Sequence, residues 1–128
     1  MERAEIHSEG APKPVGSYSQ AIRIGNLVFC AGQIGIDPKK NELVEGGVEN
    51  EARRVLDNLN AVLDAAGLSF DEVVKTEVFV TNPDDFKKVN EIYSTYFKKD
   101  PKPARQSVCV AALPKNAKVE ISCIASLG

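Results

Sequence analysis

The chain has 128 residues, of which 43% are hydrophobic and 27% charged, and its formal net charge at pH 7 is −2. This length fits a single domain over residues 1–128, and the composition is that of an ordinary globular protein with its own core. A charge so close to zero does not indicate a nucleic-acid binder, which usually carries a basic stripe.

Local sequence excludes several other classes of protein. No apolar run approaches the roughly 20 residues of a membrane helix, and the N-terminus lacks the apolar segment of a secretory signal. The cysteines Cys30, Cys109 and Cys123 are odd in number and widely spaced, so we expect buried, reduced thiols in a cytoplasmic protein. His7 is the one histidine, so the Cys and His cluster of a zinc site is missing and no metal is expected.

The first half of the chain is predicted to form three strands followed by a helix. Two prolines and two glycines exclude helix between residues 10 and 17, where the chain must be extended or turned. The third strand is apolar on both faces, as a central strand is. The helix has apolar residues at three- and four-residue steps and ends at Gly67, a residue suited to left-handed backbone. The strands are residues 1–9 (or a loose arm), 21–24 and 27–32, and the helix is 48–66.

The second half is predicted to form a strand, a second helix and two further strands. The first of these strands alternates between two faces. Asn82 and Pro83, followed by two acidic residues, are a typical helix start. The last two strands flank a turn and are expected to pair as a hairpin. The strands are residues 73–81, 105–111 and 118–126, and the helix is 83–97.

These elements define an α+β fold with one mixed sheet. Right-handed crossovers are expected to place both helices on one face of that sheet. Two helices cannot cover the other apolar face, so we expect the protein to form oligomers.

Two charged residues on the predicted hairpin are candidates for chemistry. Arg105 must meet an acid, water or an anion, so it is either part of a surface ion pair or a bidentate anchor for a small carboxylate or phosphate. Glu120 interrupts an apolar strand, and it either faces solvent or acts as a general acid/base or water-orienting group. A hairpin centred on Lys115 pairs Glu120 with Val110 and Arg105 with Ala125, which puts the two charged side chains on opposite faces unless a bulge intervenes.

Four other positions are weaker candidates. Tyr18 follows a rigid Pro-Val-Gly loop and either packs or offers its hydroxyl to a ligand. Gly32 in an apolar strand indicates the close approach of another backbone or a ligand. Asn90 lies off the apolar stripe of its helix and is expected in solvent. Ser107 has no histidine nearby, which argues against a Ser-His-Asp arrangement, and no glycine-rich nucleotide motif is present.

Several separated motifs stand in a fixed order between about residues 11 and 125. They are Pro14-Val15-Gly16-Ser17-Tyr18-Ser19-Gln20-Ala21, Gly32-Gln33-Ile34, Leu56-Asp57-Asn58-Leu59, Val89-Asn90-Glu91-Ile92-Tyr93, Pro103-Ala104-Arg105 and Val119-Glu120-Ile121. Together these motifs resemble those of the YjgF family, also called the Rid family. The resemblance implies a chorismate-mutase-like α+β fold, assembled as a homotrimer with ligand clefts between subunits.

The deaminases of that family hydrolyse enamine and imine intermediates such as 2-aminoacrylate, 2-iminopropanoate and 2-iminobutanoate, which pyridoxal-phosphate dehydratases release from serine and threonine. The resemblance implies that Arg105 holds the substrate carboxylate, that Glu120 orients or activates the attacking water, and that Tyr18 lines the cleft. It places Asn90 near the site. No cofactor is implied, because the carbon of a protonated imine is already electrophilic.

Three further positions, Gly32, Ala31 and Ser107, correspond to family positions that contact substrate or differ from the common family residue. The resemblance implies that Gly32 and Ser107 contact substrate through their backbone. Ala31 stands at a substrate-binding position where many deaminases carry Ser, which bears on substrate preference, and Ser107 stands where some carry Cys.

Two other functions stay open: a non-catalytic trimer that binds small carboxylates and regulates enzymes, and an endoribonuclease or translation inhibitor. The net charge and the lack of a nearby histidine argue against the latter.

Overall fold

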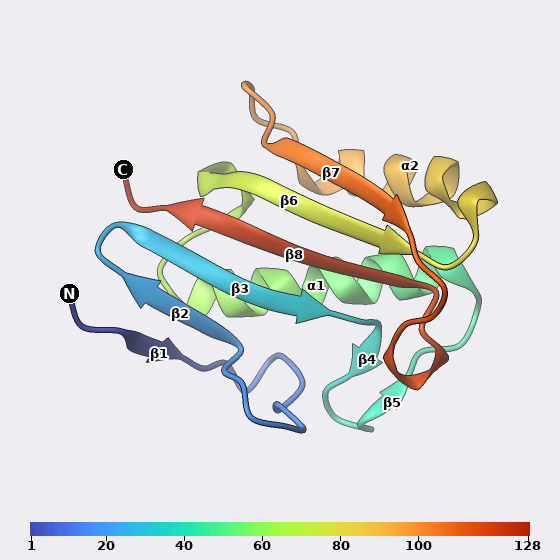
Figure 1. Cartoon of the computed structure of the whole chain (residues 1–128), viewed down its shortest axis with the longest axis horizontal. Coiled ribbons are helices and arrows are strands. Elements are labelled where there is room, and N and C mark those ends of the chain that lie inside the picture. The colour runs from blue at the N-terminus through green and yellow to red at the C-terminus, as the bar shows by residue number, and fades with distance from the viewer.

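A six-stranded sheet in the order β1-β2-β3-β8-β6-β7 forms the centre of the computed structural model, which describes residues 1–128 (Figure 1). β6 and β7 run parallel and all other neighbours run antiparallel, so the sheet is mixed, as predicted. The strands are β1 (Ala4–Ile6), β2 (Ala21–Ile24), β3 (Leu27–Gln33), β6 (Val73–Val80), β7 (Ala104–Cys109) and β8 (Val119–Ser126).

Both helices, α1 (Val48–Ala65) and α2 (Phe86–Tyr96), cover the same face of this sheet, which confirms the predicted α+β architecture (Figure 1). A small second sheet pairs β4 (Ile36–Asp37) with β5 (Glu42–Leu43). Neither helix combines the length and the apolar character needed to cross a bilayer.

The apolar stripe of α1 packs against β3 and β8 in the core. Val55, Leu56, Leu59, Val62 and Leu63 are fully buried. Their three- and four-residue spacing is the reason that the helix was predictable, since burial of such a stripe supplies most of the stability of a helix.

The start of α2 differs from the prediction. Asn82 does cap a turn, because its side chain accepts a hydrogen bond from the backbone N–H of Asp84 at 3.0 Å. That turn, Pro83–Asp85, is a separate 3-10 turn, and the α-helix begins only at Phe86.

The predicted hairpin between the last two strands is wrong. β7 pairs only with β6, at the edge of the sheet, whereas β8 lies between β3 and β6. The connection between them holds consecutive left-handed residues at Lys115 and Asn116, and it carries the chain past β6 to the centre. Every second residue of β8, from Val119 to Ala125, is buried, and a central position lets this whole face pack beneath α1.

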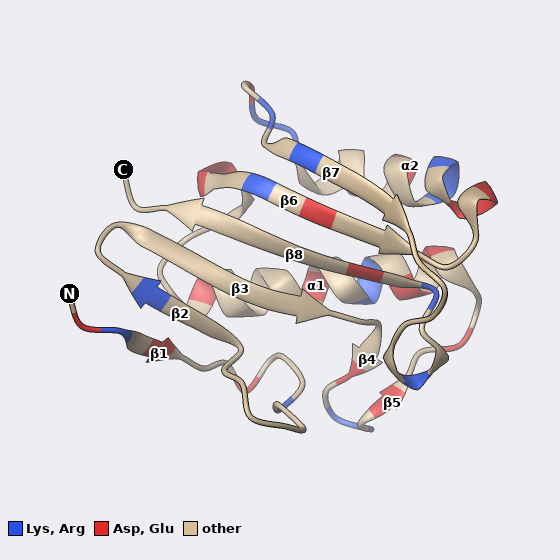
Figure 2. Cartoon of the chain, viewed as in Figure 1, with Lys and Arg blue, Asp and Glu red and all other residues tan.

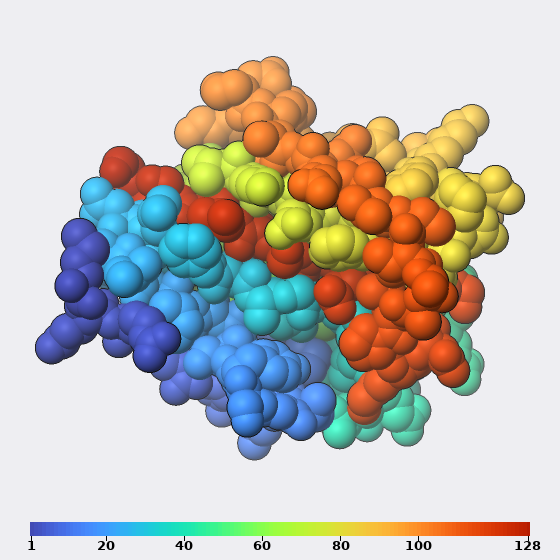
Figure 3. All heavy atoms as spheres, viewed as in Figure 1, coloured from blue at the N-terminus to red at the C-terminus, as the bar shows by residue number.

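The other face of the sheet carries no helix. Leu27 and Phe29 on β3 point to this face and are 39% and 42% exposed. In the space-filling view, the side chains of β3, β8 and β6 form the molecular surface directly (Figure 3). Basic and acidic residues are interspersed along the elements, without a basic stripe (Figure 2).

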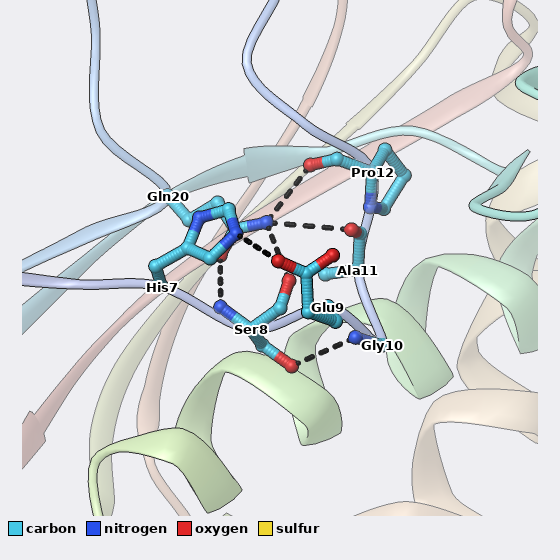
Figure 4. Close-up of polar contacts among 7 residues, drawn as sticks. All are labelled: His7, Ser8, Glu9, Gly10, Ala11, Pro12 and Gln20. Carbon is cyan, nitrogen blue, oxygen red and sulfur yellow. Dashed lines mark hydrogen bonds and ion pairs between the residues drawn. The ribbon is translucent and has the colours of Figure 1, made fainter.

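The segment between β1 and β2, residues 7–20, is called the N-terminal arm below. The buried side chain of Gln20 fixes this arm to the sheet (Figure 4). Its Oε1 accepts a hydrogen bond from the N–H of Ser8 at 2.6 Å. Its Nε2 donates to the carbonyl oxygens of Pro12 at 2.9 Å, Ser8 at 3.1 Å and Ala11 at 3.4 Å. The amide thereby satisfies backbone groups that have no strand partner, and it fixes the start of the segment that leads to Tyr18.

Candidate active site

The guanidinium of Arg105 is held by two neutral groups. Its Nη1 donates to Oδ1 of Asn90 on α2 at 2.8 Å, and its central carbon lies 4.8 Å from the centroid of the Tyr93 ring. The three ion pairs of the chain involve other residues. Of the two interpretations made from sequence, the surface ion pair is therefore absent, and Arg105 presents a positive charge that no carboxylate neutralises.

Tyr93 is itself held in place by a hydrogen bond and by ring stacking. Its hydroxyl hydrogen-bonds the hydroxyl of Thr76 on β6 at 2.8 Å, and its ring stacks on Phe97 with a centroid distance of 4.2 Å. Burial raises the pKa of Tyr93, so the hydroxyl stays protonated. In the sequence, Tyr93 stands out only as the last residue of the motif Val89-Asn90-Glu91-Ile92-Tyr93. Its spacing of three residues from Asn90, which puts both side chains on one helix face, was the available signal for a shared role.

Arg105 and Asn90 open onto a hollow of about 310 Å³ on the helix-covered side of the sheet, which we call the Arg105 hollow. Ser107, the second site residue predicted on β7, lines the same hollow. The remaining lining residues are Val78, Phe86, Lys87, Val89 and Tyr93. A free guanidinium beside apolar walls is suited to a small carboxylate with a short apolar side chain.

Glu120 is half-buried on the opposite face of the sheet, where its strand neighbour is Phe79. Burial raises the pKa of its carboxyl group, and no hydrogen bond or ion pair offsets this effect. A carboxylate whose pKa is raised toward neutrality can both accept and return a proton.

Gly32 lies directly beneath the Glu120 side chain. A Cβ atom placed on this glycine would lie 2.7 Å from Oε2 and 2.9 Å from Cδ of Glu120. The close approach expected at Gly32 is thus made by a side chain of the same molecule, rather than by a backbone segment or a ligand.

A second hollow, of about 360 Å³, joins Tyr18, Ala31 and Gly32 to Glu120, and we call it the Glu120 hollow. Tyr18 is 52% exposed in the loop before β2. Its backbone N–H donates to the carbonyl oxygen of Gly16 at 2.9 Å, which makes a tight turn. The other lining residues are Pro12, Lys13, Val15, Gln33, Ile34, Ile36, Asn41, Pro114 and Lys115.

The sheet separates the two hollows within one chain. Arg105 is in register with Thr76, which is buried under the helices, whereas Glu120 is in register with Phe79 on the uncovered face. The expected placement of Arg105 and Glu120 on opposite faces is correct, although the hairpin used to derive it does not exist. Each chain therefore carries two separate hollows, and neither of them holds both charged residues.

Neither hollow has the donors of a metal site. No group of three or more His, Cys, Asp or Glu side chains lies close enough together to hold a metal ion. The cysteines correct one expectation, because Cys30 and Cys123 are buried but Cys109 on β7 is exposed.

The profile of the family described as Endoribonuclease L-PSP matches residues 8–127, and the chain belongs to this family, the YjgF/Rid family. A protein of Rattus norvegicus named 2-iminobutanoate/2-iminopropanoate deaminase is 47% identical over 126 residues, covering 98% of this chain and 91% of the relative. Among solved structures, YyfA of the Rid family from Yersinia pestis has a TM-score of 0.95 at 45% identity, covering 98% of this chain and 99% of the other. E. coli TdcF with bound serine has a TM-score of 0.90 at 38% identity, covering 96% and 98%.

Proposed function

We propose that the protein is a hydrolytic deaminase of reactive enamines and imines. Its substrates would be 2-aminoacrylate, 2-iminopropanoate and 2-iminobutanoate, which it converts to 2-oxo acids and ammonia without a cofactor. The observation that carries this proposal is the Arg105 guanidinium, held by Asn90 and Tyr93 and free of any carboxylate partner. A rigid, unneutralised guanidinium is suited to bidentate recognition of the carboxylate that all three substrates share.

The named activity of the rat relative supports the same reaction, since the two chains align over nearly their full lengths. We place the protein in the cytoplasm, supplied with imines by pyridoxal-phosphate dehydratases that act on serine and threonine. Its direct ligands are small 2-imino and 2-oxo acids.

The proposal requires assembly, because one chain cannot present Arg105 and Glu120 to a single small molecule. We infer a homotrimer of chorismate-mutase-like subunits in which the uncovered sheet faces pack together and bury Leu27 and Phe29. In such an assembly the Arg105 hollow of one subunit adjoins the Glu120 hollow of the next. The cleft between the two subunits then holds the substrate.

The proposed reaction follows from the properties of the Arg105 hollow and the Glu120 hollow. When the substrate arrives as the enamine, protonation at C3 gives the imine. Arg105 binds the carboxylate and so fixes C2, and Glu120 holds a water molecule and takes its proton as the oxygen attacks C2. That proton passes to the nitrogen, and Glu120 then moves the hydroxyl proton of the intermediate to the nitrogen as the C–N bond breaks, which releases ammonia and the 2-oxo acid. A positioned general base supplies about 10²–10⁴-fold of rate, and orientation of the reactants supplies more.

The remaining predicted residues have supporting roles in this mechanism. Tyr18 lines the cleft and helps to orient the substrate, and Asn90 orients Arg105. Gly32 and Ser107 offer backbone groups to the ligand. Ala31 has no hydroxyl to donate, so substrate preference is set without a side-chain hydrogen bond from this position.

A second candidate function is binding without turnover. The bound serine in the TdcF structure favours it, because serine carries the same carboxylate that Arg105 is suited to hold. The protein would then be a trimeric sensor of small carboxylates that regulates a metabolic enzyme. An endoribonuclease is disfavoured by the net charge of −2 and by the position of the single histidine, His7, on the N-terminal arm.

A coupled assay tests the proposal. A purified serine/threonine dehydratase generates the imine, and its decay is followed with the native protein, with Arg105→Ala, and with Arg53→Ala as a control for an exposed arginine on α1. We expect faster decay with the native and Arg53→Ala proteins only. Unchanged activity of Arg105→Ala excludes the anchoring role. A folded trimer that binds 2-oxobutanoate but accelerates nothing favours the sensor.

A further inference from the structure

Two buried cysteines face each other across the centre of the sheet. Cys30 on β3 is the direct antiparallel partner of Cys123 on β8, and the two residues are 6% and 3% exposed. Cα atoms of directly opposed residues in antiparallel strands are about 4.5–5.5 Å apart, which lies inside the range of about 4.4–6.8 Å that disulfides span. The backbone therefore already has the spacing of a cross-strand disulfide.

The two thiols differ in how easily they ionise. Cys123, which lies opposite Cys30, lowers the pKa of Cys30, and Cys30 raises the pKa of Cys123, while burial raises the pKa of both. Cys30 is therefore the thiol that more readily becomes the nucleophilic thiolate, with Cys123 beside it as the second sulfur.

We propose that Cys30 and Cys123 form an intramolecular disulfide when the protein meets a hydroperoxide, and that this bond is a covalent modification joining β3 to β8. The Cys30 thiolate attacks the peroxide, so that an S–O bond forms, the O–O bond breaks and hydroxide leaves. Cys123 then attacks the sulfenic sulfur, so that the S–S bond forms and the S–O bond breaks. One hydrogen peroxide is reduced to two water molecules as the two thiols are oxidised.

The bond would join the two strands that make the Glu120 hollow. Gly32 follows Cys30 on β3, and Glu120 precedes Cys123 on β8. A link between positions this far apart in sequence removes much conformational freedom from the unfolded chain. The oxidised protein should therefore unfold at a higher temperature than the reduced protein. This modification does not depend on the proposed deaminase activity.

The test uses a protein that keeps both buried cysteines but carries Cys109→Ser, because the exposed Cys109 thiol would otherwise form bonds between molecules. The folded protein is treated with hydrogen peroxide, and its intact mass and a non-reducing digest are measured. We expect the loss of two hydrogens without added oxygen, joined peptides containing Cys30 and Cys123, and a raised melting temperature, all reversed by dithiothreitol. Glutathione disulfide, which is too large to reach buried sulfur, should give little product.

Two results would overturn the proposal. One is that both thiols stay free at a peroxide dose that oxidises Cys109 in the native chain. The other is that Cys30 gains oxygen while Cys123 stays a thiol. Cys123→Ala is the matched control, in which Cys30 should gain oxygen and no joined peptide should form. The principal measurement does not require this variant to fold, because it is made with both cysteines in place.

Discussion

The carboxylate of Glu120 rests on the α-carbon of Gly32, so closely that a methyl group on the glycine would lie 2.7 Å from Oε2. Real Cβ atoms do not approach other atoms at this distance, so one of the two groups must shift if a methyl group is added. The group that meets it is the end of a flexible side chain, and Gly32 is not among the glycines with positive φ. A side chain at this position therefore displaces the Glu120 carboxylate without straining the strand.

Gly32→Ala should reduce deaminase activity while leaving the fold intact. Displacement by about 1 Å of the carboxylate that we propose to orient the water is expected to cost about 10²-fold in kcat/KM. The melting temperature and the binding of 2-oxobutanoate, which depends on Arg105, should change little. Because the proposed effect acts through Glu120, adding Gly32→Ala to Glu120→Gln should cause no further loss. Additive losses in that double variant would show that Gly32 acts on the substrate directly.

Tyr93 should act as the positioning residue of Arg105. Tyr93→Leu removes the ring beneath the guanidinium and should raise KM by roughly 2- to 30-fold, which corresponds to a cation–π interaction of about 0.5–2 kcal/mol. Tyr93→Phe keeps the ring, so KM should stay near the native value. If both variants raise KM equally, the hydroxyl rather than the ring positions Arg105.

The hydroxyl of Tyr93 should matter for stability instead. Tyr93→Phe leaves the buried Thr76 hydroxyl without its partner, and we expect a loss of about 1–3 kcal/mol in the free energy of unfolding. Thr76→Val in the same chain removes the unpaired group and should recover most of this loss. Denaturant unfolding of the two single variants and the double variant measures the effect. An unchanged free energy in Tyr93→Phe would mean that water replaces the lost hydroxyl.

The spacing of apolar residues predicted the elements whose formation depends on residues close together in the chain. Helix α1 packs one face against the sheet, so its apolar residues recur at three- and four-residue steps, and this spacing predicts the helix. The pairing of β8 is decided by competition among distant strands, and closeness to β7 in sequence wrongly favoured a hairpin. Asn90 was placed in solvent, and it is indeed exposed, but its hydrogen bond to Arg105 joins residues 15 apart on two elements. Nothing in the local sequence specifies that contact.

The candidate site likewise contains residues that the sequence indicates and contacts that it does not. The motifs single out Arg105 and Glu120, and alternation along their strands puts them on opposite faces. Alternation does not reveal that Tyr93 supports Arg105, because a tyrosine in an apolar stripe is ordinarily part of the core. Nor does it reveal that the space left by Gly32 is filled by Glu120, since the two residues meet only after β3 and β8 come together in the sheet.

Gln20 should control the order of the N-terminal arm. Gln20→Leu removes the amide that hydrogen-bonds to Ser8, Ala11 and Pro12, and it leaves several of their part-buried or buried backbone groups without this partner. We expect a loss of about 1–3 kcal/mol in stability and faster amide hydrogen exchange of Ser8. Gln33→Leu, at another buried glutamine, is the matched comparison and should leave exchange in the arm unchanged. Equal exchange at Ser8 in the native and Gln20→Leu proteins would show that the arm is held by other contacts.

The raised pKa of Glu120 makes both stability and activity depend on pH. Because burial raises the folded-state pKa above the unfolded value, the carboxyl group stabilises the fold in its protonated form. This contribution is complete below the ordinary pKa of a glutamate, and it is lost as pH rises through the raised folded-state pKa. Glu120→Gln, which is never charged, should therefore melt at a higher temperature than the native protein at neutral pH, and the difference should vanish at acid pH.

The same variant should lose activity as it gains stability. Without a carboxylate to take the proton of water, we expect kcat to fall by roughly 10²–10⁴-fold. In the native protein, kcat should decline on the acid side with a midpoint above the ordinary glutamate pKa, and this limb should be absent from the residual activity of Glu120→Gln. Melting curves and rates measured over one pH series test both effects together. A Glu120→Gln protein that melts at a lower temperature than the native protein at neutral pH would show that the charged carboxylate is stabilised in the fold. Such a result would contradict the direction of the pKa shift on which the acid–base role of Glu120 depends.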